Sequence, residues 1–302
     1  MNTNVDIKIC LAGKEKIIFN AKHIDNFLKK YLKKENQSFL ITPMKYGILS
    51  GGKKIRTSVI MGAGKLFNIN SLKLINICGA VECIHSYSLI HDDLPCMDND
   101  KYRRGKLATH MKFGESTAVL AGNSLLTLAF EMISNNKYLI KNESKLELVK
   151  ELAFCSGHSG IAGGQELDLR FEKKKKNFNQ IIDMQRKKTG KLFNFCCLSA
   201  GIVAEKNKQI KNELGLLGEE IGLLFQLADD FIDIKSSTKI AGKSVKKDKK
   251  KGKLTLISLI GYDEAVNFAN QLKKKILKKL KKYGKKADDL METVEFILGR
   301  DF

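Results

Sequence analysis

Hydrophobic side chains recur along most of this chain at the spacing of buried helices. Between residues 74 and 91, and again between 214 and 232, apolar residues fall on nearly every side of the predicted helix, which is typical of a helix surrounded by other helices. Residues 116–133 and 181–204 also have helical spacing. No stretch shows the strict alternation that predicts a strand. The pattern predicts an all-α fold, a single large helical bundle, with residues 1–302 forming one domain.

Glycine and asparagine segments interrupt the helical pattern and predict loops at 50–52, 105, 135–136 and 242–252. A lysine-rich stretch at 273–286 carries Ile276, Leu277 and Leu280 at helical spacing, which predicts an amphipathic basic helix. Two interpretations of its apolar face stay open: packing on the core, or contact with a membrane surface.

The charge of the chain raises the question of an anionic partner. Its 302 residues include 54 Lys and Arg against 33 Asp and Glu, a formal net charge of +21. Nucleic acid, an anionic membrane or an anionic substrate would suit this charge. The excess is mostly lysine with few aromatic residues among it, unlike surfaces that bind single-stranded nucleic acid. We therefore expect solvated surface lysines and no nucleic-acid partner.

Cysteine usage and the terminal sequence bear on location. The seven cysteines are an odd number without a Cys-x-x-Cys pair, which argues against a zinc site and against a disulfide framework. The N-terminal residues lack the pattern of a signal peptide, and no run of ~18 apolar residues predicts a membrane span. These features predict a cytoplasmic protein without stable membrane insertion.

Aspartates within apolar sequence are the most informative anomaly, because a buried carboxylate is costly unless it is paired or bound to a metal. Asp229, Asp230 and Asp233 interrupt the apolar helix 214–232 and its end. Asp229 and Asp233 are four residues apart and so share one helical face. Hard oxygen ligands on one face are suited to Mg²⁺.

A second acidic group follows the apolar helix 74–91. Asp92 and Asp93 end that helix, and Asp98 lies further along the chain, at a separation that a straight helix would turn by about 240°. Pro95 breaks the helix, so we expect the chain to bend and bring Asp98 back. No other acid is expected inside the buried helices.

Basic residues beside glycines complement these acids. Arginine and lysine are the side chains that hold phosphates, and together with paired carboxylates they predict a pocket for Mg²⁺-bridged diphosphates. These basic residues are Lys53, Arg56, Arg103, Arg104, Lys188, Lys243 and Lys253.

The combined pattern resembles the trans-isoprenyl diphosphate synthase family, and within it the bacterial farnesyl diphosphate synthases. The first aspartate-rich motif of the family is matched by Asp92, Asp93 and Asp98, and the second by Asp229, Asp230 and Asp233. Further matches are the segments 51–56, 103–105, 163–169 and 225–226. The resemblance implies the all-α isoprenoid synthase fold around a central cavity, a homodimer and three Mg²⁺ per site.

The resemblance also implies a role for each matched residue. Two Mg²⁺ on the allylic diphosphate would be held by Asp92, Asp93 and Asp98, and the third by Asp229 and Asp233. The allylic diphosphate would be bound by Arg103, Lys188, Lys243 and Lys253. Isopentenyl diphosphate would be bound by Gly52, Lys53, Arg56, His85 and Arg104. Thr189 and Gln226 would lie near the reacting carbons, with the Lys188 carbonyl.

The implied activity is a short-chain trans-prenyl transfer, and Tyr87 bears on the length of its product. Tyr87 precedes Asp92 by five residues, about 7.5 Å along a helix. An aromatic ring there would end the cavity for the growing chain, and in the family it accompanies short products, so we expect farnesyl diphosphate (C15). Tyr87 as an ordinary core residue is the alternative. Cys83 and Ser88 leave room, so C20 or C10 products also stay open.

The sequence departs from the family pattern at a few positions, none of them an expected metal ligand: Lys54, Thr57, Leu107, Ala108, Asn123, Leu256 and Ile257. A terpene cyclase would have a different second metal motif, and a head-to-head synthase would not need Lys53 and Arg56. An inactive regulatory subunit would lack one acidic group. Both groups are present, which favours the condensing enzyme.

Overall fold

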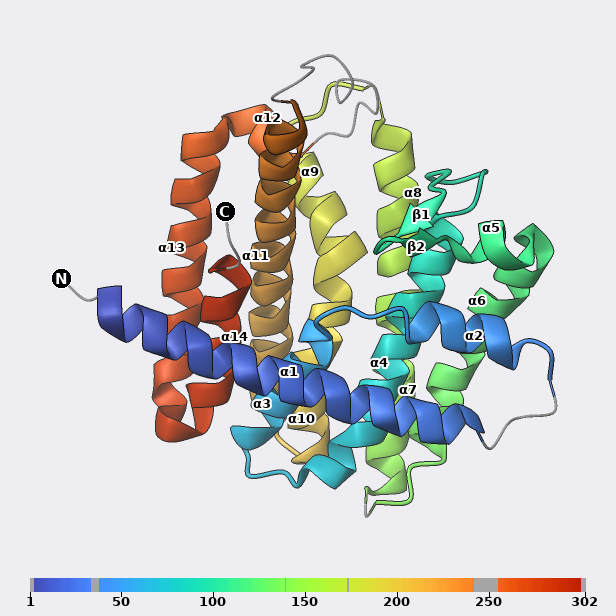
Figure 1. Ribbon diagram of the computed structural model, residues 1–302. Helices are drawn as coiled ribbons and strands as arrows, with labels where there is room; N and C mark the ends of the chain where they lie inside the picture. The colour runs from blue at the N-terminus through green and yellow to red at the C-terminus, as the bar shows by residue number, and fades with distance from the viewer. Residues whose placement is uncertain (1–2, 34–37, 139, 173, 242–254, 300–302) are drawn as a thin grey trace.

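The computed structural model describes residues 3–33, 38–138, 140–172, 174–241 and 255–299, and within them the chain is a bundle of helices (Figure 1). The predicted all-α class is confirmed. In chain order the elements are α1 Thr3–Lys33, α2 Ile41–Ile48, α3 Ile55–Lys65, α4 Ser71–Asp92, β1 Tyr102–Arg103, β2 Lys106–Leu107, α5 Thr109–Phe113, α6 Glu115–Ser134, α7 Asn142–Ser156, α8 Ile161–Phe171, α9 Phe178–Gln185, η1 Arg186–Gly190, α10 Lys191–Val203, α11 Lys208–Ala241, α12 Leu256–Ile260, α13 Tyr262–Leu280, η3 Lys281–Ala287 and α14 Asp288–Leu298.

The centre of the bundle is formed by α4, α10 and α11. α4 packs against α1, α2, α3, α6 and α10, and α10 packs against α3, α7 and α11. Side chains on all sides of α4 are buried, among them Ile77, Val81 and Ile84. Burial on every side is what the apolar pattern of residues 74–91 predicts, because each face meets another helix.

The predicted helix 181–204 is continuous but changes its winding. Residues Arg186–Gly190 form a π-helical turn between α9 and α10. Such turns are rare and are frequently found at functional sites. α8 packs closely against this turn: a Cβ on Gly164 would lie 2.1 Å from the Lys188 backbone nitrogen. Only glycine permits this approach, which fixes the positions of Lys188 and Thr189.

A small antiparallel pair, β1–β2, was not predicted. It pairs Tyr102 with Leu107 and Arg103 with Lys106. The two residues between the strands, Arg104 and Gly105, have φ of 51° and 74°, the left-handed backbone of a type I′ hairpin turn. Two residues per strand are too few for hydrophobic alternation to reveal.

The lysine-rich stretch forms the end of α13 and all of η3. Ile276 and Leu280 are fully buried, so of the two interpretations of its apolar face the structure supports packing on the core. Several of its lysines form ion pairs: Lys275 and Lys279 lie 2.9 and 2.7 Å from Glu220.

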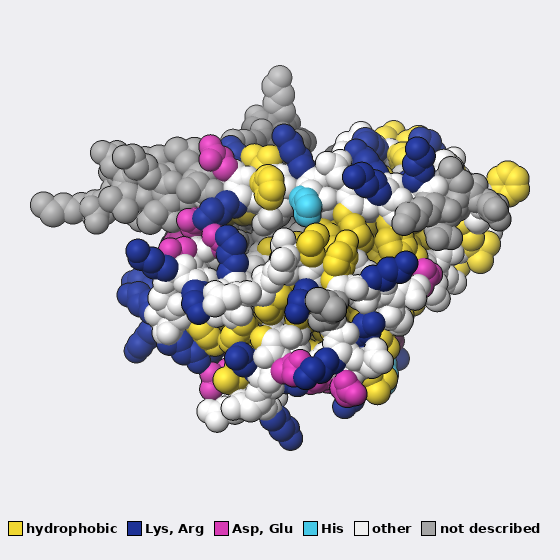
Figure 2. All heavy atoms as spheres, turned by 90° about the horizontal axis from the view of Figure 1, so that it is seen from below, with side chains coloured by type: hydrophobic (Ala, Val, Ile, Leu, Met, Phe, Trp, Pro, Cys, Tyr) yellow, Lys and Arg dark blue, Asp and Glu magenta, His cyan; other side chains and the backbone are white. Residues whose placement is uncertain are grey.

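Lysine and arginine side chains are spread over the lower face of the molecule among apolar ones (Figure 2).

One helix within the described residues, α6, is long and apolar enough to cross a membrane by length and composition. The sequence analysis expected no apolar run long enough to span a membrane, and α6 differs from that expectation. In the bundle α6 packs against α2, α4, α5 and α7, and Ala121, Leu125 and Ala129 are fully buried. Packing against other helices explains the buried part of α6, which is 44% of this apolar window.

Candidate active site

The chain bends back on itself at the end of α4, as the position of Pro95 predicts. α4 ends at Asp92, and the backbone nitrogen of Asp98 donates to the Asp92 carbonyl oxygen at 2.8 Å. Asp100 makes the same kind of bond to Asp93 at 3.2 Å. Asp92 and Asp98 are both half-buried. The bend returns Asp98 to the helix end.

Asp93 is the buried member of this group and is held by Arg103. The Arg103 Nε donates to both Asp93 carboxylate oxygens at 3.0 and 3.3 Å, and its terminal nitrogen adds a further short bond. Burial raises the pKa of Asp93, although Arg103 opposes this shift. The β1–β2 hairpin supplies Arg103, so this turn provides the counter-charge for the end of α4.

A pocket of about 220 Å³ lies beside the hairpin. Its lining includes Gly52, Lys53, Arg56, His85 and Arg104, all five residues that the resemblance assigns to one diphosphate. Asp229 of the second acidic group lies on the same wall. These residues come from the 51–56 segment, α4, the hairpin and α11, so the fold brings together what the sequence separates.

Positive charge in this pocket is crowded. Arg56 is half-buried, with its guanidinium over the rings of Phe193 (4.9 Å) and Phe225 (5.6 Å), a stabilising cation–π arrangement. Burial lowers the pKa of Arg56, and burial together with Arg56 and Arg104 holds the pKa of His85 well below its usual value. His85 is therefore neutral at neutral pH, and the pocket suits an anion.

The loop that forms the pocket edge depends on Gly52. Its φ is +107°, and a Cβ there would lie 2.7 Å from the Arg104 guanidinium carbon. Arg104 in turn donates to the Gly51 carbonyl oxygen and to Ser50 Oγ. The positive φ is the reason for glycine here, and a Cβ would also displace the Arg104 guanidinium.

Thr189 and Gln226, predicted to lie together, are joined by a hydrogen bond. Thr189 Oγ1 donates to Gln226 Oε1 at 2.9 Å, and Gln226 Nε2 donates to Asp230 Oδ1 at 2.9 Å. Gln185 donates to the other oxygen of Asp230 at 3.4 Å. This chain links the π-helical turn to the second acidic group on α11.

Lys188 forms an ion pair with Asp168 of α8, with its Nζ 2.6 Å from Oδ2. Both side chains are only partly exposed. Asp168 belongs to the matched segment 163–169, but nothing in the sequence pattern indicates that it pairs with Lys188. The pair holds the lysine at the π-helical turn.

The second acidic group concentrates negative charge. Asp229 is half-buried, Asp230 buried and Asp233 exposed. Burial raises the pKa of Asp230 to about 7; the hydrogen bond from Gln226 opposes this shift, and the nearby charges of Asp233, Asp229 and Asp168 add to it. Carboxylates under mutual repulsion fit a divalent cation with hard oxygen ligands.

The aspartates do not converge into a preformed site. In the part of the chain that the structure describes, no three acidic, histidine or cysteine side chains are grouped closely enough to hold a metal. Mg²⁺ commonly takes only one or two carboxylates and completes its shell with waters and substrate phosphates. Such binding does not need three protein ligands in one place.

Tyr87 and Ser88 lie on α4 below the acidic end. The Tyr87 ring packs edge-on against His91, with ring centroids 5.7 Å apart. Burial raises the pKa of the Tyr87 hydroxyl. Its hydroxyl lies 3.5 Å from the Ser156 carbonyl oxygen of α7. Ser88 Oγ donates to the His85 carbonyl oxygen at 2.9 Å. Lys243 and Lys253, also predicted to bind substrate, lie outside the described residues.

One expectation about buried acids is wrong. Glu82, in the middle of α4, is 1% exposed, although no acid outside the two aspartate groups was expected there. It accepts a hydrogen bond from Thr57, one of the departures from the family pattern, and faces Lys54, another. A carboxylate inside the apolar sequence 74–91 was the available signal.

The other positions that depart from the family pattern differ in their burial. Ala108, Leu256 and Ile257 are buried, and Asn123 is exposed. Leu107 is exposed, and its carbonyl oxygen accepts a hydrogen bond from the Tyr46 hydroxyl at 2.8 Å. None of these contacts involves an aspartate of the two acidic groups.

Comparison with known proteins places the chain. Residues 37–297 match the family model described as polyprenyl synthetase. The chain is 42% identical to the farnesyl diphosphate synthase of Buchnera aphidicola subsp. Acyrthosiphon pisum over 79% of this chain and 84% of that protein. It is 36% identical to the farnesyl diphosphate synthase of Micrococcus luteus over 95% and 99%.

A solved structure agrees over nearly the whole fold. The crystal structure of an FPP/GFPP synthase from Zymomonas mobilis superposes with a TM-score of 0.85 at 34% identity, covering 96% of this chain and 99% of that one. With two acidic groups, a basic pocket that includes Asp229 of the second group, and a family match over most of its length, the chain belongs to the polyprenyl synthetase family.

Proposed function

We propose that this protein is a farnesyl diphosphate synthase, which condenses isopentenyl diphosphate with dimethylallyl and then geranyl diphosphate, releasing diphosphate at each step. The basic pocket lined by Lys53, Arg56, His85 and Arg104 beside Asp229 carries this proposal. In such a reaction a negatively charged diphosphate lies next to aspartate side chains, and a divalent cation between them offsets the repulsion. The names of the similar proteins support the same activity.

Three Mg²⁺ form part of the proposal. Asp92 and Asp98, with Asp93, would hold two of them, and Asp229 with Asp233 the third. Because Asp93 is already bonded by Arg103, its role includes orienting that guanidinium. Bound Mg²⁺ neutralises the charge that develops on a departing diphosphate.

The side chains of the chain itself divide the work. Arg103 and Lys188 would bind the allylic diphosphate, and Lys188 would exchange Asp168 for a phosphate oxygen. Lys53, Arg56 and Arg104 would bind isopentenyl diphosphate in the basic pocket. Charge-assisted bonds of this kind also orient the two substrates for attack.

Thr189 and Gln226 would act at the reacting carbons. The Thr189 hydroxyl donates its proton to Gln226 Oε1, which leaves an oxygen lone pair for the positive charge on the allylic carbon. Fixed dipoles stabilise such developing charge without reorganisation. The isopentenyl double bond then attacks the allylic carbon, and the departing diphosphate accepts the proton that is lost.

The C15 product is proposed from Tyr87. Its ring packs against His91 in the turn that precedes Asp92, and its hydroxyl is directed at α7. A chain that grows from the acidic end along α4 would meet this ring after about 7.5 Å. The ring would limit elongation.

A homodimer is proposed from the resemblance and from exposed apolar side chains. Val119 and Leu120 on α6 are 38% and 52% exposed, and Leu146 and Phe154 on α7 are 71% and 51% exposed. Exposed apolar patches commonly mark protein interfaces. Sedimentation should give a dimer, and Leu120→Asp should shift it toward the monomer. The cytoplasmic location and the absence of a nucleic-acid partner stay predictions.

One assay tests the proposed function. Purified protein is incubated with Mg²⁺, isopentenyl diphosphate and labelled dimethylallyl or geranyl diphosphate, and products are separated by chain length. Farnesyl diphosphate as the main product is expected. Geranyl or geranylgeranyl diphosphate would overturn the C15 assignment, and no elongated product would overturn the activity.

A further inference from the structure

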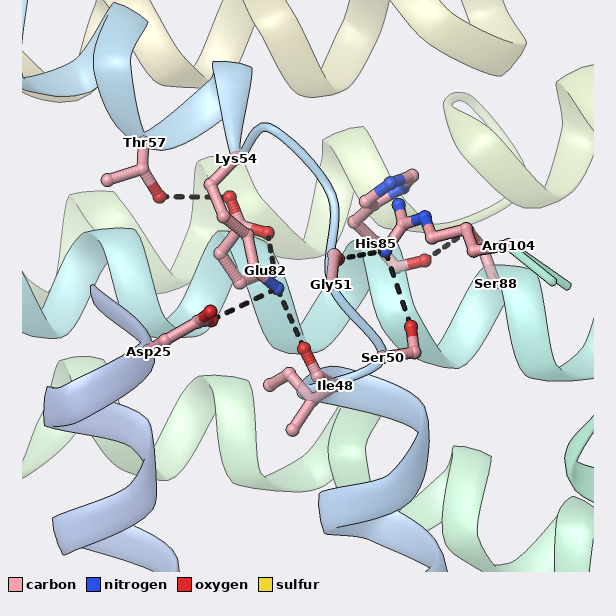
Figure 3. Close-up of polar contacts among 10 residues, drawn as sticks. All are labelled: Asp25, Ile48, Ser50, Gly51, Lys54, Thr57, Glu82, His85, Ser88 and Arg104. Atoms are coloured by element: carbon pink, nitrogen blue, oxygen red, sulfur yellow. Dashed lines mark hydrogen bonds and ion pairs between the residues drawn. The ribbon is translucent and has the colours of Figure 1, made fainter. Parts of the chain in front are cut away.

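Lys54 is a buried cation immediately after Lys53. Its side chain is 4% exposed, and its Nζ donates to the Ile48 carbonyl oxygen at 2.7 Å. Two carboxylates complete its surroundings, Glu82 at 3.5 Å and Asp25 at 3.7 Å. Figure 3 shows the ammonium group among these acceptors, with Arg104 on the other side of the loop. Lys54 and Glu82 also line the basic pocket, but the ammonium group itself is engaged by these acceptors and not by Lys53, Arg56 or Arg104.

These contacts join four helices. Asp25 comes from α1, Ile48 from the end of α2 and Glu82 from α4. Glu82 Oε1 also accepts from Thr57 Oγ1, in the first turn of α3, at 2.9 Å. A buried charge that loses its partner is strongly destabilising, so these groups fix one position for the start of α3.

The backbone of Lys54 makes the turn into α3. Its φ and ψ are 48° and 45°, a left-handed conformation uncommon for a residue with a side chain. Such a conformation persists only where the surroundings hold it. The turn sets where Lys53, just before it, and Arg56, in the first turn of α3, meet the basic pocket.

The two sides of the loop 50–54 are held differently. On the pocket side, Arg104 donates to Ser50 Oγ and to the Gly51 carbonyl oxygen. Arg104 is itself an expected substrate ligand, so its hold on the loop competes with substrate. The Lys54 ammonium has no such competing task.

We infer that Lys54, anchored by Asp25, Glu82 and the Ile48 carbonyl, is a positioning residue that presets Lys53 and Arg56 for the diphosphate in the basic pocket. The assignment of that diphosphate to isopentenyl diphosphate rests on the proposed function. Lys54 does not touch the reacting atoms, so its effect falls on binding of one substrate.

The first test compares Lys54→Met, which removes the charge and keeps the length, with Lys54→Arg, which keeps the charge. Lys54→Met should raise the KM for isopentenyl diphosphate roughly tenfold to hundredfold through misplaced cations. The KM for geranyl diphosphate and the kcat at saturation should change little. Lys54→Arg should recover most of the affinity. Lys141→Met, which removes a lysine paired with Glu205 beyond the end of α10, is the control and should match the wild type.

A second variant separates positioning from stability. Lys54→Met leaves Asp25 and Glu82 without their cation, so its melting temperature should fall. Adding Asp25→Asn and Glu82→Gln removes those charges and should recover much of the melting temperature, whereas the KM for isopentenyl diphosphate should stay high. Recovery of both together would show a merely structural role and overturn the inference.

Binding of inorganic diphosphate without Mg²⁺, measured by calorimetry, gives a readout that needs no activity. The wild type should bind, and Lys54→Met should bind more weakly by a factor similar to the KM change. An unchanged dissociation constant in the folded variant would overturn the inference. If diphosphate binding falls as expected while the wild type makes no prenyl product, the proposed function fails and the positioning role of Lys54 stands.

Discussion

Asp93 at the end of α4 is bonded by the guanidinium of Arg103, whereas Asp230 in the middle of α11 is bonded by the side-chain amides of Gln226 and Gln185. Burial raises the pKa of both carboxylates, and for Asp230 the neighbouring acids add to the shift. The α4 group therefore has a built-in counter-charge. The α11 group accumulates charge that an added cation would offset.

The largest expected effect comes from removing one expected metal ligand on each helix. Asp92→Ala and Asp229→Ala should each lower turnover by roughly a thousandfold, because charge on the departing diphosphate would lose its neutralisation. Circular dichroism should show an intact fold for both. Asp233→Ala, which removes the exposed second ligand proposed for the third Mg²⁺, should lose less. Near-normal turnover of Asp92→Ala would contradict the assignment of the α4 group.

The counter-charge of the α4 group is tested by Arg103→Ala. This change should raise the KM for the allylic diphosphate and lower the free energy of unfolding by about 1–3 kcal/mol, since Asp93 loses its charged partner. Urea unfolding measures the second effect. The double variant with Asp93→Asn should regain stability but not substrate affinity. Equal stability of Arg103→Ala and wild type would show that the two acidic groups differ less than their contacts imply.

The pH dependence of stability is the corresponding test for the α11 group. The pKa of Asp230 is about 7 in the folded chain against 3.8 for an ordinary aspartate, so the folded state binds more protons between these values. Its contribution to stability is therefore lost as pH rises from about 4 to 7, by at most about 1.4 kcal/mol per pH unit. Asp230→Asn should flatten this decline without Mg²⁺. Identical pH profiles for both proteins would contradict the shift.

Replacing an aromatic residue near each acidic group should have the smallest effect on rate, and each replacement should change a different property. Tyr87→Ala should lengthen the product beyond C15 with little change in total turnover. Phe225→Ala, which removes a ring beneath Arg56, should instead raise the KM for isopentenyl diphosphate and leave the product length unchanged. Chromatography of the products distinguishes the two. An unchanged product from Tyr87→Ala would mean that its ring does not limit the chain.

Much of the site could be predicted because its signals are local. Apolar residues at helical spacing predicted the helices, and Pro95 predicted the bend that joins Asp98 to Asp92. The π-helical turn at Lys188 and Thr189 was not predictable, since it depends on the approach of α8 through Gly164.

The sequence alone determined the helical class, the two acidic groups and the basic residues near them, because periodicity and short motifs lie within a few turns of chain. Only the tertiary structure decided which charges meet: Asp93 with Arg103, Lys188 with Asp168, and Lys54 with Glu82 and Asp25. Partners far apart in sequence leave no periodic signal. Their pairing follows from how the helices pack, and packing depends on the whole core at once.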